Sequence, residues 1–159
     1  MTMQPPFDPE AKLHALGLEL PTPAKPVAAY VPFRRTGNLL FISGQIPMSA
    51  GQLIAKGAVP SQVSIETAVA AARQCALNAL AVVKMAVGDL AQVRQIIRLG
   101  CFVCSDVGFT EQPKVANGAS DLLVQVFGDR GQHARAAVGS IALPLGAAVE
   151  VEMIVEVES

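Results

Sequence analysis

HARAAVGSIALPLGAAVEVEMIVEVE, residues 133–158, holds two segments with the patterns expected of β-strands. The first is a short apolar run that carries Arg135, and the second alternates valine or methionine with glutamate beyond a Leu-Pro turn. The turn predicts that the two strands pair, which would bring Arg135 close to Glu150 in one sheet. A guanidinium in so apolar a strand needs a partner, because an unpaired buried charge is costly.

This pair of charges has two interpretations. The planar fork of Arg135 fits a carboxylate bidentately, and a partly buried Glu150 can accept a proton or hold a water, so together they would form a site for a small acid. A structural Arg135–Glu150 ion pair accounts for the spacing equally well. The four glutamates of the last strand share one face, a pattern more typical of solvent exposure than of catalysis; they are Glu150, Glu152, Glu156 and Glu158.

Upstream of residue 133, hydrophobic periodicity predicts two strands, a helix, a strand and a second helix. A turn at residues 36–38 joins the first two strands, Ser64 caps the first helix and Gly88 ends it. The second helix is expected to begin at Thr110 and to end before Gly128. The order β-β-α-β-α-β-β predicts an α+β fold, a mixed sheet with two helices packed on one face, with residues 92–104 as the third strand and residues 48–62 as loop.

The length predicts a single domain over residues 1–159, with residues 1–26 as an N-terminal arm. The arm is rich in proline and contains one short helical pattern, in which Leu13, Leu16 and Leu20 share a face. We expect it to pack on the surface of the core.

The composition is unusually apolar. Apolar residues make up 52% of the chain and charged residues 16%, and the mean hydropathy is +0.44. Because ordinary soluble domains contain ~25% charged residues, a small monomer would have difficulty covering this much apolar surface. A homo-oligomer that buries apolar faces between subunits is therefore expected.

The charge pattern disfavours several classes of partner. The net charge is −1 and no basic cluster exceeds the pair Arg34-Arg35, so the sequence predicts no nucleic-acid binding. The longest apolar stretches, such as residues 136–149, are interrupted by Gly, Pro and Ser and predict no membrane span. Residues 1–12 lack the basic start and apolar run of a signal peptide, which predicts a cytoplasmic protein.

The chain carries three cysteines and two histidines. The odd cysteine count predicts reduced thiols. Cys101 and Cys104 form a CxxC pattern, but the surrounding sequence predicts a strand, on which the two side chains point to opposite faces. With no second CxxC pattern and only His14 and His133, no zinc site is predicted, and no nucleotide-cofactor motif is present.

Further positions near the N-terminal hairpin are candidates for ligand contact. Ser43 and Gly44 follow an apolar strand, where glycine lets the backbone approach a ligand and leaves N–H groups free; an ordinary strand-ending turn is the alternative. Tyr30, the only tyrosine, either offers its hydroxyl or packs against the core.

Residues 27–157 resemble the RidA/YjgF family of enamine/imine deaminases. AAYVPFRRTGNLLFISGQIP (28–47) is similar to the family's tyrosine-containing first strand and SGQ(I/L)P turn, and GCFVCSD (100–106) also matches. HARAAVGSIALPLGAAVEVEMIVEV (133–157) is similar to its PAR…LP…EIEAIA signature. The N-terminal arm and residues 109–139 resemble a longer-chain bacterial subgroup.

The resemblance implies roles for individual residues. Arg135 matches the arginine that clamps the substrate carboxylate, and Glu150 the glutamate that helps place the attacking water. Ala137 stands where many members carry a cysteine that acts through its backbone carbonyl, a group that alanine retains. The other implied contacts are Tyr30 in the pocket wall, Ser43 and Gly44 in the turn that meets the substrate, and Asn117 on the second helix.

The resemblance also implies a chorismate-mutase-like fold and a homotrimer with clefts between subunits. The implied activity is hydrolysis of 2-enamino or 2-imino acids, such as those released by PLP-dependent lyases, to 2-oxo acids and ammonia, with no cofactor. The expected ligand is a small imino or oxo acid. A non-catalytic small-carboxylate-binding or regulatory module that uses the same cleft is the alternative.

Overall fold

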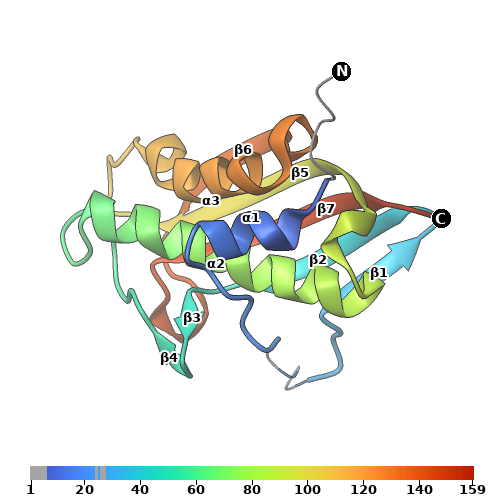
Figure 1. The fold of residues 1–159 in the computed structure, drawn as a ribbon. Coiled ribbons are helices and arrows are strands. Elements are labelled where there is room, and N and C mark those ends of the chain that lie inside the picture. Colours follow the sequence, from blue (N-terminus) through green and yellow to red (C-terminus); the bar gives the residue numbers. More distant parts are fainter. Residues whose placement is uncertain (1–6, 24, 26–27) are drawn as a thin grey trace.

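The computed structural model describes residues 7–23, 25 and 28–159. Its centre is a five-stranded sheet in the order β1-β2-β7-β5-β6, in which β5 and β6 are parallel and the other neighbours antiparallel (Figure 1). The strands are β1 (Phe33–Thr36), β2 (Leu39–Gln45), β5 (Val93–Cys104), β6 (Ala134–Ser140) and β7 (Val149–Val157).

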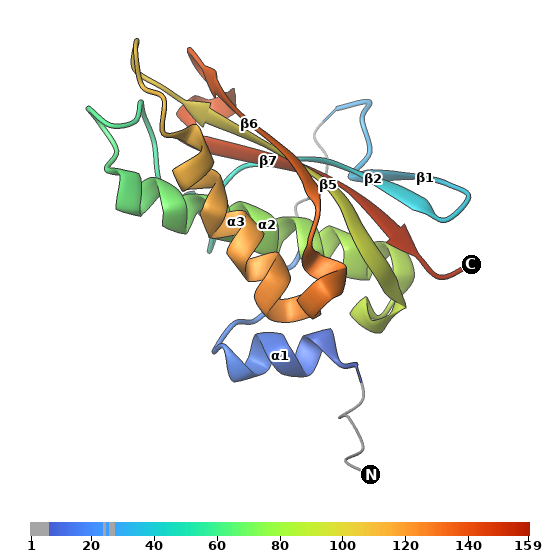
Figure 2. The same ribbon diagram turned by 90° about the horizontal axis from the view of Figure 1, so that it is seen from above.

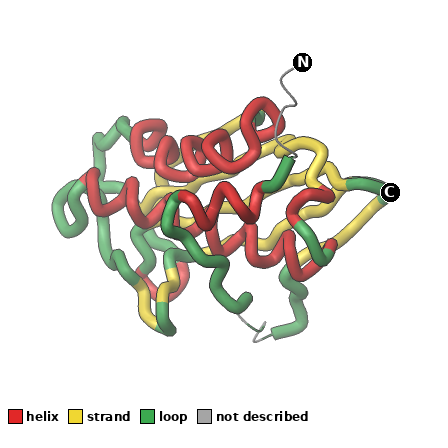
Figure 3. The backbone as a smooth tube through the Cα atoms, viewed as in Figure 1, coloured by secondary structure: helices red, strands yellow, loops and turns green. Residues whose placement is uncertain are grey.

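The helices cover one face of this sheet. Helices α2 (Ile65–Val87) and α3 (Gln112–Phe127) lie side by side against it, and α1 (Pro9–Ala15) packs on the outer side of the helical layer (Figure 2). A hairpin of β3 (Met48–Ser49) and β4 (Gln52–Leu53) stands at one end, among loops (Figure 3). The opposite face of the sheet carries no helix among the described residues, and we call it the open face.

Helix α2 begins and ends where the sequence predicts. The Ser64 hydroxyl accepts a hydrogen bond from the Thr67 N–H, and Gly88 ends the helix with a φ of 83°. Alanines along its buried face let the helix lie close to the sheet. By length and composition α2 could cross a membrane, but 67% of its most apolar window is buried inside the fold. Its apolar character is therefore that of a core helix.

The alternation of β7 sets the two faces of the sheet. Val149, Val151 and Met153 point into the core beneath the helices and are at most 2% exposed. Glu150 and Glu152 point to the open face between them. The predicted α+β fold with two helices on one face is confirmed, and so is the first hairpin, with its turn at residues 37–38.

The predicted pairing of the last two strands is wrong, because β5 lies between β6 and β7. The chain leaves β5, crosses over through α3 and returns as β6 parallel to it, a connection that a helix naturally makes. After β6, the Leu-Pro segment passes over the end of β5 through a 3₁₀ turn at Pro144–Gly146. Strand β7 then runs antiparallel on the other side of β5.

Smaller boundaries also differ from prediction. Glu111, not Thr110, precedes α3 and makes no side-chain capping bond, and Pro113 lies in the first turn, where its missing N–H is tolerated. The segment expected to be loop contains the β3–β4 hairpin. In the arm, Leu13 is buried but Leu16 is 40% exposed, because the helix ends at Ala15 and Gly17 turns the chain with a φ of 71°.

Candidate functional site

Arg135 and Glu150 lie on opposite faces of the sheet. Arg135 stands opposite Leu99 in β5, whose side chain is buried beneath the helices. Glu150 stands opposite Phe102, three residues further along β5, on the open face. The Arg135–Glu150 ion pair is therefore absent, and within one chain the two side chains do not converge.

Helix α3 holds the guanidinium of Arg135. Nη1 donates to Asn117 Oδ1 at 2.9 Å and to Ser120 Oγ at 3.0 Å, two acceptors one turn apart on the helix. The predicted placement of Asn117 on the second helix is confirmed. Neither Nε nor Nη2 bonds to any group within residues 7–23, 25 and 28–159, and Arg135 belongs to none of the ion pairs there.

The unbonded edge of Arg135 has a chemical consequence. Nε and Nη2 present two parallel N–H groups, which is the geometry that a carboxylate accepts bidentately. Strand β6 is the edge strand of the sheet, and Arg135 is exposed there. The arginine can therefore receive an anion from outside the chain.

Glu150 lies half-buried in the middle of the open face. Gly44 in β2 leaves room for it, since a Cβ atom at Gly44 would lie 2.0 Å from Glu150 Oε1. Burial, followed by the nearby negative charge of Glu152, raises the pKa of Glu150 above its usual value. A carboxyl group in this state exchanges protons more readily near neutral pH than an exposed glutamate does.

Ser43 ties the start of the hairpin to β2. Its hydroxyl donates to the Val31 carbonyl at 2.6 Å, and its backbone N–H donates to the Pro32 carbonyl at 2.9 Å. The Ser43 N–H is therefore occupied within the chain and is not one of the N–H groups that could meet a ligand here. Tyr30 directly precedes the tied segment and is 55% exposed, so its hydroxyl is not packed into the core.

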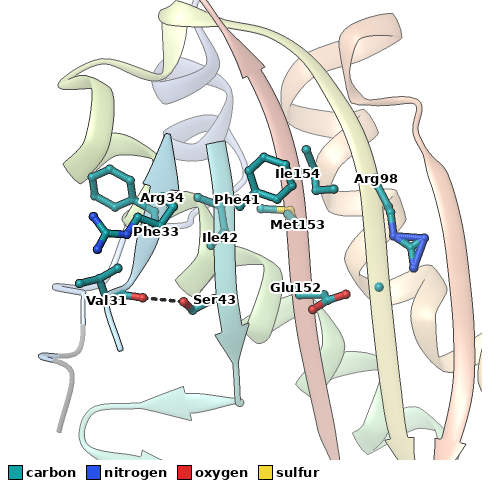
Figure 4. Close-up of a pocket in the computed structure, with 11 residues that line it drawn as sticks. Val31, Phe33, Arg34, Phe41, Ile42, Ser43, Arg98, Glu152, Met153 and Ile154 are labelled. Atoms are coloured by element: carbon teal, nitrogen blue, oxygen red, sulfur yellow. Dashed lines mark hydrogen bonds between the residues drawn. The ribbon is translucent and has the colours of Figure 1, made fainter. Parts of the chain in front are cut away.

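The open face carries a shallow hollow of about 260 Å³ beside Ser43 (Figure 4). Apolar side chains of β1, β2 and β7 form much of its wall, and Arg98 and Glu152 add charge from β5 and β7. Its lining residues are Val31, Phe33, Arg34, Phe41, Ile42, Ser43, Arg98, Gly100, Glu152, Met153 and Ile154.

The remaining predicted site residue, Ala137, lies in edge strand β6 opposite Cys101 and packs partly against the core. Burial raises the pKa of the Cys101 thiol to about 12, so this sulfur stays protonated and unreactive. Cys104 stands three positions later on the same strand, so the strand interpretation of the CxxC pattern is confirmed. The described cysteines are all free thiols.

Two residues that are connected to Arg135 by hydrogen bonds were not predicted from the sequence. Ser120 accepts from Arg135, and His133 in turn lies 2.9 Å from the Ser120 hydroxyl. The available signal was spacing: Ser120 follows Asn117 by one helical turn, and His133 precedes Arg135 by two residues.

Comparison with known proteins identifies the family. A family model described as "YjgF/chorismate_mutase-like, putative endoribonuclease" matches residues 10–157. This chain belongs to the YjgF/RidA family. Among its YjgF/RidA relatives, Protein TCP17 of Trypanosoma cruzi is 43% identical over 150 residues, which are 94% of each chain.

Two solved structures are similar over almost their whole length. A protein of unknown function from Agrobacterium tumefaciens is 47% identical with a TM-score of 0.90, over 94% of this chain and 92% of its own. A protein from Shewanella oneidensis named a putative endoribonuclease is 36% identical with a TM-score of 0.92, over 94% and 99% of the two chains. Both proteins therefore share the fold of this chain.

Proposed function

We propose that this RidA-family protein hydrolyses 2-enamino or 2-imino acids to 2-oxo acids and ammonia. The observation that carries the proposal is the guanidinium of Arg135, which is fixed by α3 on one side and presents an unbonded Nε–Nη2 edge on the other. A substrate carboxylate is the ligand that this edge fits best.

The proposed site is built from two copies of the chain. Arg135 and the Ala137 carbonyl come from the β6 edge of one subunit, with Asn117 beside them on α3. Glu150, with Ser43 and Gly44 of β2 and with Tyr30, comes from its neighbour. The separation of Arg135 and Glu150 onto opposite faces supports this arrangement, as does the low charge content of the chain. In a closed ring of three subunits, every such contact would form a cleft.

The chemistry follows from these groups. An enamine takes a proton at carbon and becomes the imine, whose carboxylate Arg135 holds. A water held by Glu150 and the Ala137 carbonyl attacks the C=N carbon, and proton transfer to nitrogen gives a carbinolamine. Cleavage of its C–N bond releases ammonia and leaves the 2-oxo acid. Because imines are already electrophilic, positioning and modest proton transfer are sufficient for this reaction.

Removal of the guanidinium tests the proposal. Stopped-flow loss of 2-iminopropionate should fall about 100-fold in kcat/KM for Arg135→Ala, since two charge-assisted hydrogen bonds are lost. Arg135→Lys keeps the charge without the fork and should lose about tenfold. Equal rates in the wild-type and Arg135→Ala proteins would contradict the assignment.

Binding without turnover would favour the non-catalytic alternative. In that case a 2-oxo acid such as pyruvate should raise the Tm of the wild-type protein but not that of Arg135→Ala, while imine decay proceeds at its uncatalysed rate. The Tm shift reports carboxylate binding and the rate of imine decay reports catalysis. Because both are measured on the wild-type and Arg135→Ala proteins, the two functions can be separated.

A further inference from the structure

A chain of hydrogen bonds continues from Arg135 into the protein. Ser120 Oγ, which accepts from Arg135 Nη1 at 3.0 Å, lies 2.9 Å from His133 Nε2. His133 Nδ1 lies 2.6 Å from the carbonyl oxygen of Gly131. Four groups are thus connected in series: they come from α3, from the 3₁₀ turn at Gly128–Gly131, from the connection that follows this turn and from β6.

The direction of each hydrogen bond follows from the carbonyl at the end. A carbonyl only accepts, so His133 Nδ1 carries the hydrogen and donates it to Gly131. In the neutral imidazole Nε2 is then an acceptor and takes the hydroxyl proton of Ser120. Because the hydroxyl hydrogen of Ser120 points to His133, the lone pairs of Ser120 Oγ are left to accept from Arg135. The bonds therefore run one way, from guanidinium to hydroxyl to imidazole to carbonyl, an order in which each bond polarises and strengthens the next.

The carbonyl that ends the series sits on a closely packed backbone. A Cβ atom at Gly131 would lie 2.2 Å from the carbonyl oxygen of Leu123 in α3, so only glycine allows this approach. Gly131 is buried, while Ser120 and His133 are partly buried. The imidazole is consequently anchored to the end of α3, not to a loop that could move independently.

This arrangement fixes which edge of Arg135 is available. Asn117 and Ser120 occupy both hydrogens of Nη1, so the end-on fork formed by Nη1 and Nη2 is no longer open. The side-on fork formed by Nε and Nη2 stays available. Since a free arginine side chain has many rotamers, an arginine already ordered by the protein loses less conformational entropy when a ligand binds.

We propose that Ser120 and His133 are positioning residues for the substrate carboxylate, holding Arg135 so that its Nε–Nη2 edge faces the ligand. This inference rests on the proposed function of Arg135 and deepens it. Neither residue touches the ligand. Their effect is expected on carboxylate affinity, in KM more than in kcat, because the carboxylate is held equally in the ground state and the transition state.

Two pairs of variants test the positioning role. Ser120→Ala and His133→Asn remove the hydroxyl and the Nε2 acceptor, and each should raise KM for 2-iminopropionate and Kd for pyruvate about five- to tenfold, with kcat within about twofold of wild type. Ser120→Thr keeps a hydroxyl, and His133→Gln places an amide oxygen where it can accept from Ser120. Ser120→Thr and His133→Gln should therefore keep most of the wild-type affinity for pyruvate.

A control on the same helix separates this effect from general damage. Gln125 lies elsewhere on α3 and accepts an exposed hydrogen bond from Arg73 of α2. Gln125→Ala removes this bond and should leave KM, Kd and kcat unchanged. Tm measurements establish that each variant is folded, and if Ser120→Ala is not, the His133 pair carries the test alone.

The outcomes distinguish the two proposals. If Arg135→Ala loses binding while Ser120→Ala and His133→Asn bind as the wild type does, the positioning inference is wrong and the proposed function stands. If the Thr and Gln variants lose as much affinity as the Ala and Asn variants, the inference is also overturned. If Arg135→Ala itself binds and reacts normally, the proposed function fails first.

Discussion

At the scale of single residues, the carboxylate of Glu150 lowers the stability of the fold at neutral pH and is proposed to take part in proton transfer. Burial and the neighbouring Glu152 raise its pKa above the ordinary value of 4.5. Folding therefore favours the protonated form, so the contribution of this group to stability is complete below pH 4.5 and is lost as the pH rises through the raised pKa. At neutral pH the fold tolerates a partly desolvated carboxylate that it would be more stable without.

Replacement of this carboxylate should separate stability from activity. Glu150→Gln is expected to raise Tm at pH 7 and to leave Tm at pH 4 nearly unchanged, because only the ionised form is destabilising. It should also lower kcat by about 100-fold and abolish the acid limb of the wild-type pH–rate profile, which should lie above pH 4.5. Thermal melts and imine hydrolysis across pH 4–8 measure both effects. A lower Tm at pH 7, or an unchanged acid limb, would contradict this account.

The identity of the candidate site residues could be predicted from the sequence, but their positions relative to one another in the sheet could not. Family signatures point to Arg135 and Glu150, and β6 and β7 were correctly predicted as strands. The sequence has no local signal for β5 inserting between them, because strand order depends on a crossover through α3. Ser120 and His133 were missed for a related reason: a partly buried hydrogen-bond series joins residues from separate elements.

At the scale of elements, the packing of α3 on α2 determines where Asn117 and Ser120 stand. Gly118 faces the backbone of α2, and a Cβ atom there would lie 2.0 Å from the carbonyl oxygen of Val69. The group that this Cβ would meet is backbone, which cannot move aside as a flexible side chain can. The two acceptors for Arg135 flank this contact, so the helix–helix distance also sets the position of the arginine.

Enlargement of Gly118 should displace α3 as a unit. Gly118→Ala is expected to cost about 3 kcal/mol through overpacking, which corresponds to a fall in Tm of roughly 6–12 °C for a chain of this size. Affinity for pyruvate should fall as well, because Asn117 and Ser120 move with the helix. Asp121→Ala, an exposed change on the same helix, should alter Tm by only about 1–2 °C. A Gly118→Ala protein as stable as the wild type would show that the helices separate without strain.

At the scale of the whole molecule, composition and topology lead to the same expectation. The chain has few charged residues, and one face of its sheet carries no helix among the described residues. Phe41 and Val138 are 43% and 47% exposed on that face, and Arg135 lies on the edge strand beside it. The low charge content correctly indicated that apolar surface would stay uncovered, although it could not indicate which surface. A second copy of the chain that brings its β6 edge to this open face would unite the two halves of the proposed site.

Mixed oligomers test this arrangement directly. Arg135→Ala keeps Glu150, and Glu150→Gln keeps Arg135, so each variant alone lacks one group in every cleft. If a cleft takes its arginine from one subunit and its glutamate from the next, random co-assembly in equal amounts restores about one cleft in four. Imine hydrolysis by the co-expressed mixture should then reach about a quarter of the wild-type rate. Co-assembly of Arg135→Ala with the double variant leaves no complete cleft and should restore nothing. If both groups acted within one chain, the mixture would show only the mean of its two inactive components, and the intersubunit site would be ruled out.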